Sequence, residues 1–164
     1  MICSVIGGFG VISDHCNPYF REYMVTLVNT VNEIIALGYN TFMSEIVNEC
    51  DRSFFDVINA FRRQIGNVYI EGVVPYQCKS QATLQEELEK ECNKVHRISE
   101  IVAKRANTNI SHKYMIDISD AVLFIWNGNK GTKIYDSIKY AKETKKKIFC
   151  INCSTFKGKV KVFS

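Results

Sequence analysis

The stretch DAVLFIWNGNKGTKIYDSIKYAKETKKKIFCIN, residues 120–152, contains the pattern that decides the fold. An apolar run ends at Trp126, and a polar loop with two glycines follows. A helical pattern then begins at Thr132 and leads into a second apolar run at 147–152. Apolar runs without alternating polar residues are typical of strands buried on both faces, and a helix between two of them implies that they are parallel. The segment therefore predicts a β–α–β unit.

The same alternation of strand and helix extends over most of the chain. Strands are predicted at residues 2–6, 39–43, 68–74, 121–126, 147–152 and 159–163, and helices at 18–37, 51–65, 81–95, 110–119 and 132–144. Residues 96–102 fit either a short strand or the end of a helix. This order predicts an α/β fold with a mostly parallel sheet and helices on both faces.

Local residues predict where the first two long helices begin and end. Asn17 and Pro18 form a typical helix start, in which the asparagine caps and the proline takes the first helical position. Asp51 or Ser53 can cap the second helix. Gly38 and Gly66 follow the last apolar residues of the two helices and predict their ends.

Length and composition indicate an ordered globular protein. The chain has 164 residues, 46% of them apolar, and only two prolines, which suits a single domain over residues 1–164. No apolar run is long enough to cross a bilayer. The start, MICSVIGG, lacks the basic residues of a signal peptide, so it is interpreted as the first buried strand of a cytoplasmic protein.

The cysteines and histidines do not predict a metal or a cofactor. Seven cysteines without an export signal argue against a disulfide framework. The C-x-x-C at Cys150 and Cys153 ends a strand and is interpreted as two small buried residues. His15, His96 and His112 have no ligand spacing.

Charge is only weakly informative. The net charge is +4, and the lysines gather in the last third of the chain. A solvated surface explains them, and because no aromatic residues are interleaved among them, nucleic acid is not favoured as a partner.

In an open parallel sheet, ligands bind beyond the carboxyl ends of the strands, where helix N-termini attract phosphate or carboxylate groups. Three loops have suitable residues there, at 7–10, 44–51 and 127–132. In the last, two glycines permit sharp turns, Lys130 supplies charge, and Thr132 can cap the helix or bind an anion. An ordinary turn with a threonine cap explains the same residues.

The order of these segments resembles the SLOG superfamily, the Rossmann-like group that contains the lonely-guy phosphoribohydrolases and the Smf/DprA proteins. Residues 119–152 resemble its closing segment, and the YpsA-like branch of small stand-alone proteins is the most similar. LGYNTFMSE at 37–45, YIEGVVPYQ at 69–77 and HKYMIDISDAVL at 112–123 follow in the same order as in that branch. The resemblance covers about residues 1–153 and implies a Rossmann-like three-layer sandwich with a nucleotide pocket.

The sequence departs from that branch in the pocket. Ile6-Gly7-Gly8-Phe9 stands in place of Thr-Gly-His-Arg. SEIVNECD at 44–51 keeps Ser44 and Asp51 but replaces the family glycines with Glu45, Glu49 and Cys50. Ser111-His112 replaces Arg-Asn. Without these glycines and arginines the pocket holds a phosphate less closely, so it binds a different ligand or has decayed.

The residues do not favour the phosphoribohydrolase reaction. The catalytic glutamate of those relatives corresponds to Tyr135, and Asp136, one residue later, points about 100° away on a helix. Asp56 matches an acidic family residue. It either forms a carboxylate pair with Glu45, suited to a ribose diol or to acid/base chemistry, or is a solvated helix residue.

These observations predict a ligand site with thirteen residues: Gly7, Gly8, Phe9, Ser44, Glu45, Asp51, Asp56, His112, Asn127, Gly128, Lys130, Gly131 and Thr132. The expected function is to sense or sequester a nucleotide or a nucleotide-derived small molecule. The alternatives are an N-glycoside hydrolase or transferase acting on such a ligand, and a non-catalytic scaffold with a decayed pocket. Relatives pair through helices, so the resemblance is compatible with a homodimer.

Overall fold

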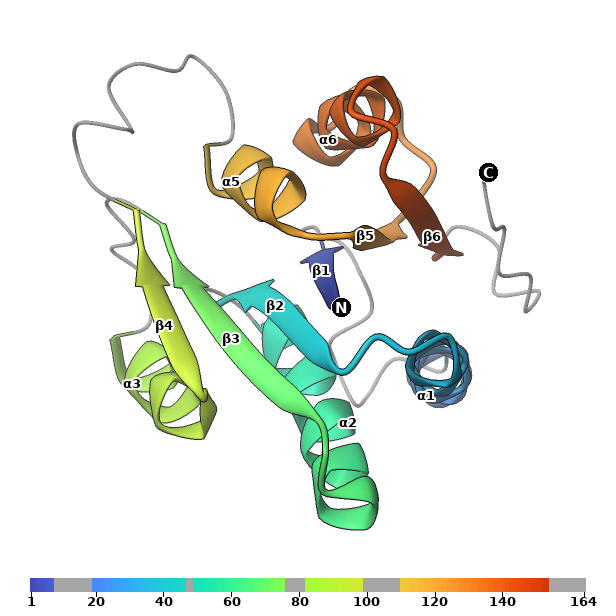
Figure 1. Ribbon diagram of the computed structural model, residues 1–164. Helices are drawn as coiled ribbons and strands as arrows, with labels where there is room; N and C mark the ends of the chain where they lie inside the picture. Colours follow the sequence, from blue (N-terminus) through green and yellow to red (C-terminus); the bar gives the residue numbers. More distant parts are fainter. Residues whose placement is uncertain (8–18, 47–48, 76–81, 99–109, 154–164) are drawn as a thin grey trace.

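The sheet is the centre of the structure, a computed structural model that describes residues 1–7, 19–46, 49–75, 82–98 and 110–153 (Figure 1). Six strands lie in the order β4-β3-β2-β1-β5-β6, and every neighbouring pair is parallel. The strands are β1 (Ile2–Gly7), β2 (Thr41–Glu45), β3 (Tyr69–Val74), β4 (Lys94–Arg97), β5 (Ala121–Trp126) and β6 (Lys147–Asn152). The predicted parallel α/β fold is confirmed.

Helices cover both faces of the sheet, as predicted. One face packs against α1 (Phe20–Ala36), α2 (Glu49–Ile65) and α3 (Ala82–Glu91), and the other against α5 (Ile110–Ile118) and α6 (Lys133–Glu143) (Figure 1). Each face has its own apolar core. Phe42 and Phe54 lie in the first core, and Phe124 and Met115 in the second. The three-layer sandwich follows from strands that are apolar on both faces.

Apolar spacing and glycines shape the long helices. In α1 the buried residues recur at helical spacing: Tyr23, Leu27, Thr30, Val31 and Ile34. Gly38 and Gly66 end α1 and α2 with φ values of +92° and +77°, which only glycine adopts easily. The predicted start at Asn17 and Pro18 lies outside the described residues, and the described helix begins at Phe20.

The structure corrects several predicted boundaries. The second strand covers 41–45 instead of 39–43, because the Tyr39 amide still bonds to the Ile34 carbonyl of α1. Helix α2 begins at Glu49, so neither Asp51 nor Ser53 precedes it as a cap. Helix α3 ends at Glu91, since the Asn93 side chain, just before β4, accepts a hydrogen bond from the Ile70 amide of β3.

The segment 96–102, which fits either a strand or a helix end by sequence, contributes its first residues to the edge strand β4. It pairs with β3 from Glu71↔Lys94 to Val74↔Arg97, which settles the first part of 96–102 as strand. The predicted strand at 159–163 lies outside the described residues. Within the described part of the chain, every helix is too short or too polar to cross a lipid bilayer.

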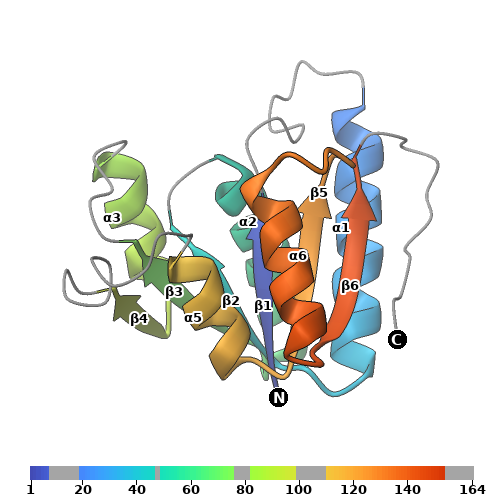
Figure 2. The same cartoon turned by 90° about the horizontal axis from the view of Figure 1, so that it is seen from above.

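The order of the strands reverses at β1. The chain passes from β1 to β2 on one side and later returns to place β5 on the other side. Gly7 at the end of β1 pairs with Ile125 of β5, and Val5 pairs with Ser44 of β2. Figure 2 shows the arrows of β1, β5 and β6 pointing the same way. The carboxyl ends of β1, β2 and β5 therefore meet at one edge, where this fold class binds ligands.

Candidate functional site

The candidate site lies at the sheet edge where β1, β2 and β5 end, which we call the rim. Gly7, Glu45 and Trp126 are the last residues of these strands. The structure thus brings together the starts of the three loops predicted from the sequence. Gly8 and Phe9, also predicted for the site, lie outside the described residues.

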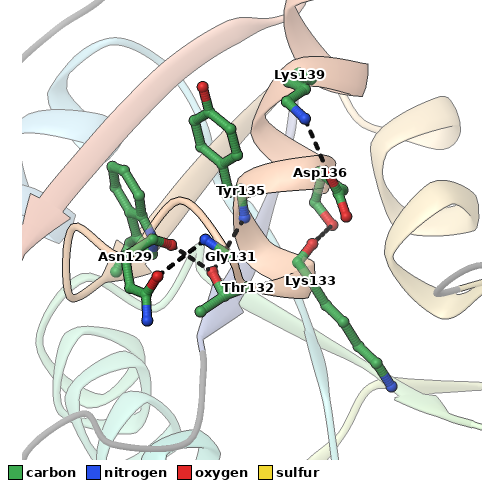
Figure 3. Close-up of polar contacts among 9 residues, drawn as sticks. Asn129, Gly131, Thr132, Lys133, Tyr135, Asp136 and Lys139 are labelled. Carbon is green, nitrogen blue, oxygen red and sulfur yellow. Dashed lines mark hydrogen bonds and ion pairs between the residues drawn. The ribbon is translucent and has the colours of Figure 1, made fainter.

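The loop from Asn127 to Thr132 is held by its own side chains. The Asn127 side-chain oxygen accepts from the Asn129 amide at 3.1 Å. The Asn129 side-chain oxygen accepts from the Gly131 amide at 2.9 Å (Figure 3). Gly128 has a φ of +84°, as its predicted turn requires. The Gly131 amide is therefore engaged inside the loop, and Lys130 is exposed.

Aromatic contacts brace the same loop. The Trp126 and Tyr135 rings stack with centroids 5.8 Å apart, and the Lys139 ammonium lies 4.6 Å from the Tyr135 centroid on α6. The Trp126 indole donates to the Asn129 carbonyl at 3.0 Å, and the Thr132 hydroxyl donates to the same oxygen at 2.9 Å. Tyr135 is therefore part of the loop's support.

Thr132 caps helix α6, as predicted. Its backbone is extended, and its hydroxyl oxygen accepts from the Tyr135 amide at 3.4 Å. The first amides of a helix have no acceptor within it, and the helix dipole makes this end attractive to anions. Lys133 follows the cap directly and extends its ammonium away from the helix (Figure 3). The rim thus presents a helix N-terminus with two lysines, Lys130 and Lys133.

Glu45 supplies a negative charge at the rim. Its carboxylate accepts a hydrogen bond from the Ser111 hydroxyl, and its other oxygen lies 3.6 Å from His112 Nε2. Burial by itself would raise the pKa of Glu45, but the hydrogen bonds from His112 and Ser111 and the charges of His112 and Lys133 lower it below its ordinary value. The site therefore holds Glu45 as a carboxylate.

His112 connects Glu45 to helix α6. Its Nδ1 lies 2.8 Å from the Ser137 hydroxyl, and its side chain is buried. The order hydroxyl, imidazole, carboxylate resembles a hydrolase triad. Ser137 is itself buried, however, and its hydroxyl also donates to the Lys133 carbonyl at 3.0 Å. We assign Ser137 a role in connecting the helices and not in attacking a substrate.

The remaining predicted residues divide between the two faces of the sheet. Ser44 and Asp51 are both buried, and the Ser44 hydroxyl lies 3.5 Å from the Asp51 carboxylate. Asp56 is more than half exposed and pairs with Arg52 at 3.0 Å on α2. Glu45 points to α5 on the opposite face, because successive side chains of a strand alternate. The predicted carboxylate pair of Asp56 with Glu45 is therefore wrong: Asp56 pairs with Arg52, and Glu45 faces Ser111 and His112.

Lowering the pH should remove stability that ionised Glu45 supplies. Because the pKa of Glu45 is lowered in the folded state, this contribution is complete above the ordinary value of 4.5 and is lost as the pH falls through the lower folded value. In Glu45→Gln, urea unfolding from about pH 7 to about pH 3 should therefore show a shallower loss of stability than the wild type. Asp136→Asn, an exposed carboxylate on α6, is the control. Parallel curves for wild type and Glu45→Gln would contradict this assignment.

Three residues that complete the cluster, Lys133, Ser111 and Ser137, were not among the predicted site residues. Lys133 directly follows the predicted cap Thr132, so the sequence already indicates that it lies at the N-terminus of the helix. The only sequence signal at Ser111 is its difference from the pattern of the resembled proteins. Ser137 shows no sequence signal, since its contact depends on the packing of α5 on α6. In the described residues, no group of three or more His, Cys, Asp or Glu side chains is placed to hold a metal ion.

Comparison with known proteins adds no identity: no family model matches the sequence, and neither does any curated protein.

Proposed function

We propose that the protein senses or sequesters a nucleotide or a nucleotide-derived small molecule at the rim. The observation that carries the proposal is the convergence of three strand ends with the N-terminus of α6 at the point where the strand order reverses. This is where nucleotides bind in open α/β sheets. The resemblance to the SLOG superfamily supports the same class of ligand.

The charges at the rim suggest how such a ligand is oriented. Phosphate groups fit the N-terminus of α6, where helix amides, Lys130 and Lys133 attract anions. Glu45 repels phosphate but accepts hydrogen bonds from sugar hydroxyls. We therefore propose that the ribose faces β2 while the phosphates face α6.

Several features favour binding over catalysis. Tyr135 replaces the catalytic glutamate of the phosphoribohydrolases and stacks on Trp126, and Asp136 points outward to an ion pair with Lys139. The described cysteines, Cys3, Cys92, Cys150 and Cys153, are unbridged, which suits the reducing cytoplasm, where we place this function. The homodimer implied by the resemblance remains a proposal.

A thermal-shift screen with nucleotides, ADP-ribose and cyclic dinucleotides tests the proposal. A ligand at a hundred times its dissociation constant should stabilise the protein by about 2.7 kcal/mol. The double variant Lys130→Ala/Lys133→Ala should remove most of this stabilisation. Lys94→Ala, which removes one exposed positive charge at the start of β4 on the opposite sheet edge, should keep it.

Two outcomes would contradict the proposal. If no compound stabilises the protein, the scaffold with a decayed pocket is favoured. If a compound stabilises both variants equally, its site lies away from the rim.

For a compound that stabilises the protein, chromatography of the recovered ligand separates binding from catalysis. Binding leaves the ligand intact, whereas the alternative N-glycoside hydrolase or transferase converts it.

A further inference from the structure

His112 occupies a position in which both ring nitrogens face an oxygen. Nε2 lies 3.6 Å from the Glu45 carboxylate on β2, and Nδ1 lies 2.8 Å from the Ser137 hydroxyl on α6. The imidazole is only 7% exposed, so these protein groups, and not bulk water, determine which protons it can carry. A histidine in such a position can change its charge without moving.

The hydrogen bonds can be completed with one proton on the ring or with two. With one proton, Nε2–H points to Glu45, and the Ser137 hydroxyl donates to Nδ1. With two, Nδ1–H donates to Ser137, and the Ser137 hydroxyl donates to the Lys133 carbonyl, which lies 3.0 Å away. Rotation of the Ser137 hydroxyl converts one of these arrangements into the other. The cluster can therefore take up a proton without breaking the packing of α5 on α6.

The ionisable groups around His112 determine what this proton does. The elements packed against α5 include β1, β2, β3 and α6. Glu45 of β2 and Lys133 of α6 act at the rim, and Glu71 of β3 pairs instead with His96. On α6, Asp136 and Lys139 pair with each other, Tyr135 stacks on Trp126, and Tyr140 bonds to Asp117 on the outside of α5. Cys3 of β1 lies in the opposite core. When the imidazole is neutral, the charges of Glu45 and Lys133 cancel. When the ring carries a second proton, the cluster has a net charge of +1.

We infer that His112 takes up a proton when an anionic ligand binds at the rim, so that binding tightens as the pH falls. The inference rests on the proposed function, since it concerns the same site. An anion at the N-terminus of α6 lies about one helical turn from Ser137 and interacts more favourably with the cluster when the cluster is positive. By linkage, the protonated cluster must then bind the anion more tightly.

Isothermal titration calorimetry with ADP-ribose measures the linkage directly. The phosphates of this probe keep a fixed charge over the range in which histidine titrates, between about pH 5 and 8. Titrations in buffers of different ionisation enthalpy should show an uptake of up to about one proton per ligand, and the affinity should fall by up to about tenfold per pH unit as His112 loses its proton. Glutamine at this position, His112→Gln, should remove the uptake.

His96 provides a matched control. It also bonds to a carboxylate, with Nε2 2.8 Å from Glu71, and to a hydroxyl, with Nδ1 2.7 Å from Tyr114, but it lies on β4 at the edge of the sheet. In His96→Gln the proton uptake should equal that of the wild type. Binding without proton uptake, or uptake that persists in His112→Gln, would overturn the inference and leave the proposed function intact. If neither ADP-ribose nor any other compound of the screen binds, the proposed function and this inference both fail.

Discussion

Replacing Phe124 with alanine should lower the free energy of unfolding by about 3–5 kcal/mol, the range for large aromatic side chains removed from a core. Phe124 is fully buried in β5, where it pairs with Ile6 of β1 and Cys150 of β6. It belongs to the core that holds α5 and α6 on the sheet. Because the neighbours of Phe124 in a dense core relax only partly, the substitution leaves a cavity, and most of the lost contacts are not replaced.

Urea unfolding of Phe124→Ala measures this loss. Ile118→Ala, at the exposed C-terminal end of α5, is the control and should change stability by less than about 1 kcal/mol. If both variants lost the same small amount, Phe124 would not lie in a dense core, and the layer that carries His112 and Ser137 would be placed incorrectly.

Replacing Gly72 with alanine should destabilise the protein by about 1–3 kcal/mol through overpacking. A Cβ atom at this position of β3 would lie 2.3 Å from Cδ1 of Ile46 and 2.7 Å from the sulfur of Cys92. Ile46 is fully buried, so its side chain has no solvent to move into. The glycine is therefore required by the close approach of its neighbours and not by its backbone angles.

Gly131→Ala is the matched control for this substitution. Its nearest contact to an added Cβ would be the Asn129 side-chain oxygen at 3.4 Å, an ordinary van der Waals distance, and its loop is exposed. Thermal unfolding should show a clear decrease in melting temperature for Gly72→Ala and little change for Gly131→Ala. Equal melting temperatures for the two variants would contradict the packing around β3.

The sequence predicted the features that depend on local signals. The apolar runs became strands, and Thr132 caps α6 with the hydroxyl that the pattern predicted. Gly38 and Gly66 end their helices at positive φ. Each of these features depends on residues close together in the chain, so a single sequence contains enough information to predict it.

Features that depend on tertiary packing could not be predicted. The pairing of Asp56 with Glu45 failed because the two residues face opposite sides of the sheet. The early start predicted for β2 failed because Tyr39 packs back on α1 and forms an edge-to-face contact with Phe149. Ser137 joined the cluster through the packing of two helices that are separate in the sequence.

The central claim is that the ends of β1, β2 and β5 form one ligand site with the N-terminus of α6. An amide NMR titration with ADP-ribose tests it most directly, because each perturbed amide reports its own position. The account predicts that the largest chemical-shift changes occur at Gly7, at Glu45 and at the first residues of α6, Lys133 and Ile134. Largest changes in β4 or on the outer side of α1, or no saturable changes at any amide, would contradict it.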